Sequence, residues 1–233
     1  MMTVLGTYGE GFVVTFEPHD ERTPTFADPA LQVACVDPTI ILKTLFKRYD
    51  SLVITSGTLS PLNMYQKLLG FTPMVSKSMP LTLSRNVACP VVLNRGSDQV
   101  AVSTRYKTRN DPSIVRNYGT LLVELSKYVP DGIVCFFISY QYLDETVSMW
   151  HQMGLLESMR RSKSILVETP NMQETCLALN NYRKACDSGR GAILFTVARG
   201  NIPDSINFSG QYGRAIVVVG LPFVNSDNQI VKA

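Results

Sequence analysis

The segment from Thr104 to Tyr118 concentrates positive charge beside aromatic rings. It carries four cations against the single carboxylate of Asp111, an excess that equals the formal net charge of +3 of the whole chain. The cations are Arg105, Lys107, Arg109 and Arg116. Because cations contact phosphates and rings such as Tyr106 and Tyr118 stack on bases, this composition indicates single-stranded nucleic acid binding. The alternative interpretation is a solvated loop followed by the start of a helix.

Small hydroxyl residues occupy a second position where chemistry is expected. Ser56, Gly57 and Thr58 follow a predicted buried strand at residues 51–55 and precede a predicted helix. The carboxyl end of a strand is where α/β proteins bind ligands. An ordinary helix cap formed by Ser60-Pro61 explains the same residues equally well.

A third candidate is Arg199-Gly200, which leaves a predicted buried strand and enters a polar loop that runs to Phe208. This pair could present a cation and unpaired backbone N–H groups to a phosphate. The alternative is a plain connection, although loops of this length tend to be functional. The chain contains no G-x-x-x-x-G-K-S/T loop, so a self-sufficient P-loop ATPase is excluded.

The elements that position these residues form two patterns. After about residue 110, strands are predicted at 133–138, 164–168, 192–198 and 215–219, with apolar helical repeats before the first and between the first three. Strands that alternate with helices predict a parallel, doubly wound α/β sheet. The earlier part predicts strands at 12–16, 31–36 and 51–55, a helix at 38–49, and an irregular connector at 72–104.

Composition restricts the class of protein. With 233 residues, 45% hydrophobic and 18% charged, the chain is typical of a globular protein. The apolar runs are too short to cross a bilayer, and the N-terminus lacks the features of a signal peptide, so no membrane association is expected. The five cysteines include no C-x-x-C pair and are interpreted as reduced, mostly buried thiols of an intracellular protein. The two histidines have no partner at ligand spacing, so no metal site is expected.

Five blocks of sequence form a recognisable series along the chain. They are Ile-Thr-Ser-Gly-Thr-Leu-Ser-Pro at 54–61, Asn-Arg-Gly-Ser-Asp-Gln-Val at 94–100, Ile-Val-Arg-Asn-Tyr-Gly at 114–119, Phe-Phe-Ile-Ser-Tyr-Gln-Tyr at 136–142 and Gly-Arg-Gly-Ala-Ile-Leu at 189–194. In sequence and in order these blocks resemble the XPD family of superfamily 2 DNA helicases, and the resemblance runs over essentially the whole chain.

This resemblance implies two RecA-like motor lobes, the first of which carries an inserted iron–sulfur domain and arch. Residues 1–65 correspond to the end of lobe one and finish in motif III, and residues 66–233 correspond to lobe two, ending before motif VI. The residues implied in motif III coupling are Ser56, Gly57 and Thr58. Those implied near the nucleotide in motif V are Arg199, Gly200, Asp204 and Asn207. Ser139 and Tyr140 fall in motif IV, and together with the four cations they are implied in DNA binding, Arg109 by its match to an arginine on the DNA-facing surface of lobe two.

The activity implied is that of an ATP-dependent 5′–3′ DNA helicase acting in nucleotide excision repair and transcription initiation. Its implied partners are single-stranded DNA and the other subunits of transcription factor IIH in the nucleus, and its cofactors are ATP with Mg²⁺ and an iron–sulfur cluster. The phosphate loop, the acidic Mg²⁺ box, the four cluster cysteines and motif VI are not among these 233 residues. The chain alone is therefore expected not to hydrolyse ATP. The alternative is a non-catalytic structural module that docks onto transcription factor IIH subunits.

Motif V departs from the family's usual ending, E-G-x-D-F. Ser205 and Asn207 stand where the family has Gly and Asp. A neutral amide is a weaker acceptor than a carboxylate, and serine lacks the conformational freedom of glycine. Weakened coupling to the nucleotide is therefore expected at this loop.

Overall fold

The computed structural model describes residues 6–7, 9–17, 30–80, 88–105, 107–198, 200–202 and 208–221. The chain divides into two compact units, which are described separately below. The first unit comprises residues 1–87 with 224–233, and the second comprises residues 88–223. The predicted boundary between residues 65 and 66 falls inside helix α3 (Leu62–Leu69).

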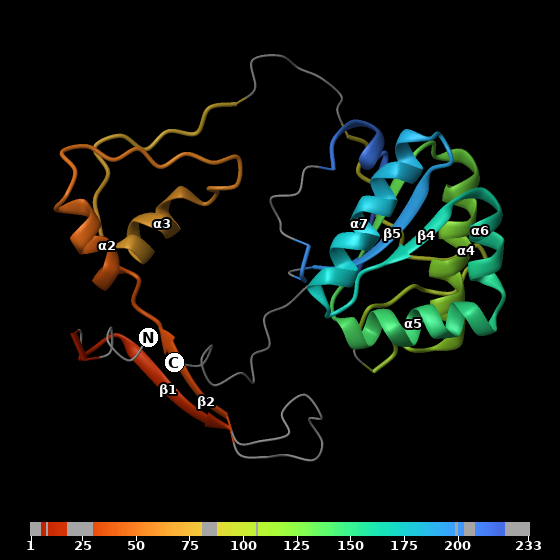
Figure 1. Ribbon diagram of the computed structural model, residues 1–233, viewed down its shortest axis with the longest axis horizontal. Coiled ribbons are helices and arrows are strands. Elements are labelled where there is room, and N and C mark those ends of the chain that lie inside the picture. Colours follow the sequence, from red (N-terminus) through yellow and green to blue (C-terminus); the bar gives the residue numbers. More distant parts are fainter. Residues whose placement is uncertain are drawn as a thin grey trace. The chain divides into compact units, whose positions relative to one another are not determined.

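The second unit is built on a parallel sheet of four strands in the order β4-β5-β3-β6 (Figure 1). In chain order the strands are β3 (Gly132–Phe137), β4 (Ser164–Val167), β5 (Ala192–Val197) and β6 (Ala215–Val219). Strand β3 lies in the centre and pairs in register with β5 on one side and β6 on the other. The predicted parallel α/β sheet is confirmed, with each strand within one residue of its predicted bounds at either end.

Four helices of the described residues flank these strands: α4 (Pro112–Tyr128) precedes β3, α5 (Tyr140–Gln152) and α6 (Leu155–Ser162) connect β3 to β4, and α7 (Met172–Asp187) connects β4 to β5. Side chains cap α4, α5 and α7. Asp111, Ser139 and Asn171 each accept a hydrogen bond from a backbone N–H of the first turn of α4, α5 and α7 respectively. Helix α6 was not predicted; it begins directly after Gly154, whose φ of 72° ends the preceding helix.

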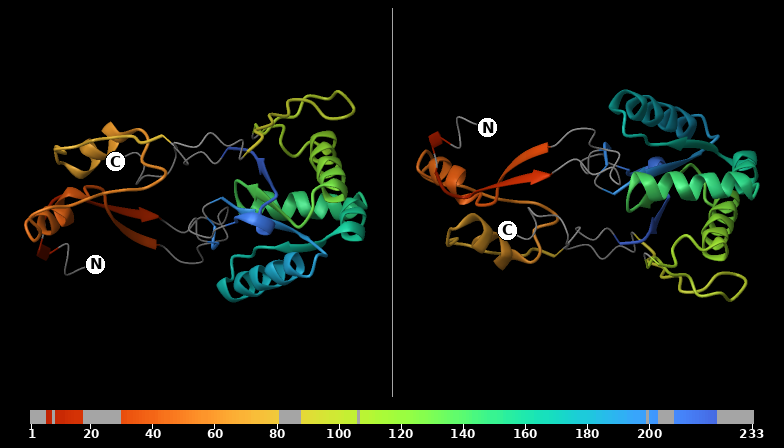
Figure 2. Two further views of the ribbon diagram at one scale, coloured as in Figure 1. Left: turned by 90° about the horizontal axis from the view of Figure 1, so that it is seen from above. Right: turned by 90° about the horizontal axis from the view of Figure 1, so that it is seen from below.

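The sheet has an apolar core on each face because its strands are buried on both sides. Alternate residues such as Ile133 and Phe137 pack against α4, α5 and α6, where Trp150 is fully buried. The intervening residues, such as Val134, pack on the opposite face against Tyr182 of α7. The views in Figure 2 and Figure 1 agree that α7 and α4 cover opposite faces.

The described part of the first unit contains a two-stranded antiparallel sheet followed by short helices. Strand β1 (Phe12–Glu17) pairs with β2 (Ala30–Cys35), and α2 (Thr39–Phe46) and α3 follow. The predicted strand at residues 51–55 is wrong: this segment has no regular structure, and Val53 is 85% exposed. A strand needs a neighbour to receive its backbone hydrogen bonds, and none of the described strands pairs with this segment.

The cysteines are free, but the expectation that most are buried is wrong. Cys135 and Cys186 are buried, and burial raises the pKa of both thiols. Cys35, Cys89 and Cys176 are exposed.

No helix in the described part of the chain has the length and apolar character that crossing a membrane requires.

Candidate site at the carboxyl edge of the sheet

The carboxyl ends of the four strands bring distant segments of the second unit together. Strand β3 leads into Ser139, β4 into Glu168 and β5 into Gly200, and parallel strands end at the same edge of a sheet. The residue after β6 is Gly220. A Cβ atom at Gly220 would lie 3.4 Å from the Cβ of Thr104, so the basic segment also begins at this edge.

Glu168 is the centre of a hydrogen-bond network at this edge. Its side chain is 1% exposed and accepts five hydrogen bonds. At Oε1 the donors are the hydroxyl of Tyr140 (2.7 Å) and the backbone N–H groups of Asn201 (2.5 Å) and Ile202 (3.1 Å). At Oε2 they are the backbone N–H of Val197 (2.9 Å) and the hydroxyl of Thr196. Every partner is therefore a donor, and both oxygens of the Glu168 side chain act as acceptors.

Gly200 lies against this carboxylate. A Cβ atom there would overlap Oε1 of Glu168 and would lie 2.8 Å from the Tyr140 hydroxyl, so no larger residue fits without displacing the network. The N–H of Gly200 donates to the carbonyl of Val197 at 2.9 Å.

The expectation of unpaired N–H groups at Gly200 is therefore wrong, and the next two N–H groups are also engaged, by Glu168. The predicted motif V residues Arg199, Asp204 and Asn207, and Ser205 with them, lie outside the described residues.

The motif IV pair has structural partners inside the unit. The Ser139 hydroxyl caps α5 by accepting a hydrogen bond from the N–H of Tyr142 at 3.3 Å. The Tyr140 hydroxyl donates to Glu168 and accepts from the N–H of Asn201 at 2.9 Å. Burial and then the hydrogen bond to Glu168 raise the pKa of Tyr140, so the phenol stays protonated at neutral pH.

The basic segment folds as a turn that leads into α4. The N–H of Arg109 donates to the carbonyl of Arg105 at 2.8 Å, and the Arg109 guanidinium lies 4.8 Å from the centre of the Tyr142 ring. The structure thus brings Arg109, half-buried, onto the first turn of α5. Arg105, Lys107 and Arg116 are exposed. A role of these cations in DNA binding stays a prediction, and Tyr106 lies outside the described residues.

The motif III residues belong to the first unit and form a small exposed turn. The hydroxyl of Ser56 lies 3.1 Å from that of Thr58 and accepts a hydrogen bond from the Thr58 N–H at 3.2 Å. Gly57 has no atom within 4 Å of the position that a Cβ would occupy. The alternative of a cap from Ser60 is not observed, because α3 has no side-chain cap. Coupling through this turn stays a prediction.

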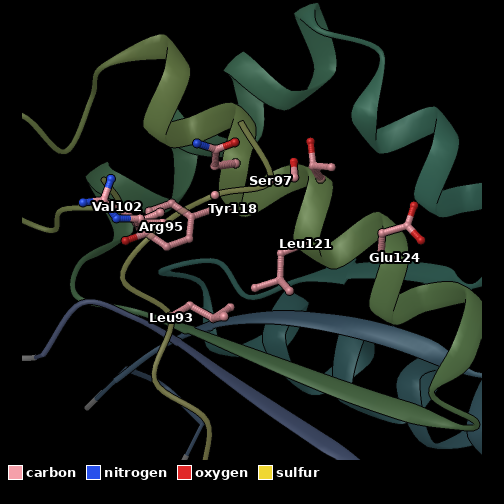
Figure 3. A pocket seen from close by; sticks show the side chains of 10 residues that line it. Leu93, Arg95, Ser97, Val102, Tyr118, Leu121 and Glu124 are labelled. Atoms are coloured by element: carbon pink, nitrogen blue, oxygen red, sulfur yellow. The ribbon is translucent and has the colours of Figure 1, made fainter. Parts of the chain in front are cut away.

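Two of the sequence blocks that carry the family resemblance, 94–100 and 114–119, meet at Gly96 and Asn117. A Cβ on Gly96 would overlap the side chain of Asn117, whose amide donates to Asp98 at 2.8 Å. Beside this contact a cavity of about 210 Å³ lies between residues 93–102 and α4 (Figure 3). Its walls are mainly apolar, and burial raises the pKa of Tyr118, one of its lining residues, to about 12. Gly96 and Asn117 therefore pack one block against the other.

Sequence reasoning missed Glu168 as a site residue. The apolar pattern predicts Glu168 only as the last residue of a strand, although a carboxylate directly after the apolar run Ile165-Leu166-Val167 is a usable signal. A charge at the end of a buried parallel strand must lie at the ligand-binding edge and must find partners there.

Comparison with known proteins identifies the family. Residues 122–233 match the family described as Helicase C-terminal domain. The chain is 49% identical, over 99% of its length, to the general transcription and DNA repair factor IIH helicase subunit XPD of Arabidopsis thaliana, and 48% identical over the same share to the subunit XPD/RAD3 of Saccharomyces cerevisiae. The chain belongs to the XPD helicase family. It spans about 30% of the length of these curated XPD relatives.

A solved structure supports the fold. The structure titled XPD_Helicase matches 95% of this chain and 35% of its own chain, with a TM-score of 0.55 at 17% identity. At this identity the likeness shows the fold alone, and it agrees with the RecA-like parallel sheet that the resemblance to XPD implies.

The cysteines of this XPD-family chain do not fit an iron–sulfur cluster. Such clusters need four thiolates in one place. All five cysteines are described, and among the described residues no three metal-ligating side chains gather.

Proposed function

We propose that this chain supplies part of the motor of an ATP-dependent 5′–3′ DNA helicase that acts in nucleotide excision repair and transcription initiation. The observation that carries the proposal is the identity of 48–49% to XPD subunits over 99% of the chain. The second unit supports it, since its parallel sheet collects the predicted motif IV pair, the start of the predicted motif V and the basic segment at one edge.

The two lobes of the motor divide the chain in this proposal. Residues 1–65 belong to lobe one and end in the motif III turn, where Ser56, Gly57 and Thr58 couple the lobes. Residues 66–233 belong to lobe two. The compact second unit, which begins at Ala88, supports a separate lobe in this part of the chain.

Single-stranded DNA binds along the basic segment. Arg105, Lys107 and Arg116 are exposed and free to reach phosphates, and Arg109 is held by its contact with Tyr142. Ser139 and Tyr140 contribute at the neighbouring start of α5, where the Tyr140 ring provides a face for a base.

ATP with Mg²⁺ binds to the complete motor, with Arg199, Gly200, Asp204 and Asn207 near the nucleotide. Arginine in this position stabilises the charge that develops on the transferred phosphate. The partners are the other subunits of transcription factor IIH, as the names of the relatives suggest, and the protein acts in the nucleus.

The test is a chimera in which this chain replaces the corresponding segment of the Arabidopsis thaliana XPD subunit. The expected result is ATP hydrolysis that single-stranded DNA stimulates, together with unwinding of a duplex with a 5′ single-stranded tail. This chain by itself, the matched control, is expected to show neither activity because it carries no phosphate loop. A correctly folded chimera without either activity would contradict the proposal.

A second candidate function is a non-catalytic module that docks onto transcription factor IIH subunits. Ser205 and Asn207 favour it, because they replace the glycine and the carboxylate of motif V. A chimera that assembles with the other subunits but does not hydrolyse ATP would support this candidate.

A further inference from the structure

We propose that Glu168 is a positioning residue, whose buried carboxylate fixes the segment after β5 (residues 200–202) against the first turn of α5. The consequence for ATP hydrolysis rests on the proposed helicase function, whereas the positioning itself rests on the geometry alone.

The carboxylate joins three separate parts of the chain. Glu168 itself follows β4, its partner Tyr140 begins α5, and its partners Asn201 and Ile202 follow β5. The amide of the Asn201 side chain adds a second connection to the segment after β4, where it donates to the carbonyls of residues 169 and 170 at 3.0 and 2.7 Å. The first residues after three neighbouring strands therefore share one network.

The donors around Glu168 form a site for an anion, and the chain supplies that anion. Three successive backbone positions after β5 have their N–H groups engaged within the protein, two of them by this carboxylate. Converging N–H groups of this kind bind phosphates in other loops. Here they are already occupied, so this segment has a fixed conformation rather than an open phosphate cradle.

A purely stabilising role does not explain a charge at this place. Desolvating a carboxylate is costly, and an apolar side chain of similar size often stabilises a core equally well. The carboxylate instead fixes the positions of its neighbours, because each of its five hydrogen bonds holds one donor group in place. Gly200 completes the arrangement, since any side chain there would overlap the carboxylate.

The direct test is amide hydrogen exchange in this chain with Glu168→Gln. The substitution keeps the shape but turns one acceptor oxygen into an NH₂ group that faces N–H and O–H donors. We expect the amides of Asn201 and Ile202 to exchange at least about tenfold faster, because local opening no longer breaks charge-assisted bonds. The central amides of β3 are expected to keep their rates.

The matched control is Glu157→Gln, an exposed glutamate on α6 whose carboxylate is 3.9 Å from Arg160. It is expected to leave the exchange of Asn201 and Ile202 unchanged. If Glu168→Gln does not fold, Tyr140→Phe takes its place, because it removes one donor to the carboxylate and one acceptor of the Asn201 N–H. Unaltered exchange at Asn201 in the variant that folds would overturn the proposal.

The consequence for activity is tested in the Arabidopsis thaliana chimera. Glu168→Gln is expected to lower the kcat of DNA-stimulated ATP hydrolysis by about tenfold, a loss of transition-state stabilisation, while the Kd for single-stranded DNA changes less than about twofold. Glu168→Asp, which keeps the charge, is expected to recover part of the rate.

The two proposals fail separately. Faster exchange in this chain combined with an inactive parent chimera would leave the positioning role standing and reject the helicase function. Faster exchange with an unchanged kcat in an active chimera would reject the link between Glu168 and hydrolysis.

Discussion

The two units differ in how they treat their apolar side chains. Every described residue that is buried lies between Ile114 and Val219 in the second unit, and none lies in the first. In the first unit Phe16 and Val53 are 66% and 85% exposed, although each lies in a largely apolar run. The difference shows that an apolar run becomes a core only when other elements cover it, as α4–α7 cover both faces of the sheet.

The largest expected effect comes from truncating the core of the second unit. Phe137 is fully buried, with ring centres 6.0 to 6.1 Å from those of Tyr142, Trp150 and Phe195. Phe137→Ala is expected to lower the free energy of unfolding by about 3–5 kcal/mol. Urea unfolding followed by the fluorescence of Trp150, the one tryptophan of the chain, measures it.

Val53→Ala is the corresponding truncation of an apolar side chain in the first unit. Because Val53 is exposed, its truncation is expected to change the free energy of unfolding by less than about 0.5 kcal/mol. An equal loss of unfolding free energy in Val53→Ala and Phe137→Ala would mean that Val53 is buried in solution and that the two units do not differ in this respect.

A smaller effect is expected from a helix cap that α7 has and α3 lacks. Asn171 accepts hydrogen bonds from two N–H groups of α7, at 2.8 and 3.4 Å, whereas α3 has no side-chain cap. Asn171→Ala is expected to cost about 0.5–2 kcal/mol and to speed amide exchange in the first turn of α7.

The matched substitution in the first unit is Ser60→Ala. It is expected to leave exchange in the first turn of α3 unchanged, because Ser60 provides no cap in the structure. Faster exchange there would show that the hydroxyl caps α3 in solution and would remove this difference between α7 and α3.

The smallest expected effect concerns DNA and rests on the proposed function. Lys107 is exposed in the basic segment of the second unit, and Lys43 is exposed on α2 of the first. Lys107→Ala is expected to make the slope of log K against log salt less steep by about 0.7, the loss of one phosphate contact. The measurement is binding of the chain to a thymine oligonucleotide over a salt series. Lys43→Ala is the control. An equal change of the salt slope in both variants would mean that binding depends on the net charge of the chain and not on the position of the lysine.

Much of the second unit follows from local sequence. Asp111-Pro112 and Asn171 mark helix starts, and the apolar run from Ile133 to Phe137 identifies the central strand, because a strand buried on both faces has no polar alternation. In these elements the local preference and the tertiary environment agree, so a prediction from pattern alone succeeds.

The failures have a common physical cause. The segment 51–55 has the composition of a strand, but pairing depends on a neighbour that local pattern does not reveal. Glu168 was missed because its partners are 28 to 34 residues away along the chain. The backbone N–H groups after β5 were expected to be unpaired because a sequence does not show which carboxylate reaches them.

The hydroxyl of Tyr140 makes two hydrogen bonds within the protein, and these limit how the residue could recognise a nucleic acid. It donates a hydrogen bond to Glu168 and accepts one from the N–H of Asn201, so its single donor is not available to read the edge of a base. Only the ring remains, and a ring stacks on all four bases because each has a π-face. In the proposed helicase, contact at Tyr140 would be independent of the base sequence, as a motor that moves along any strand requires.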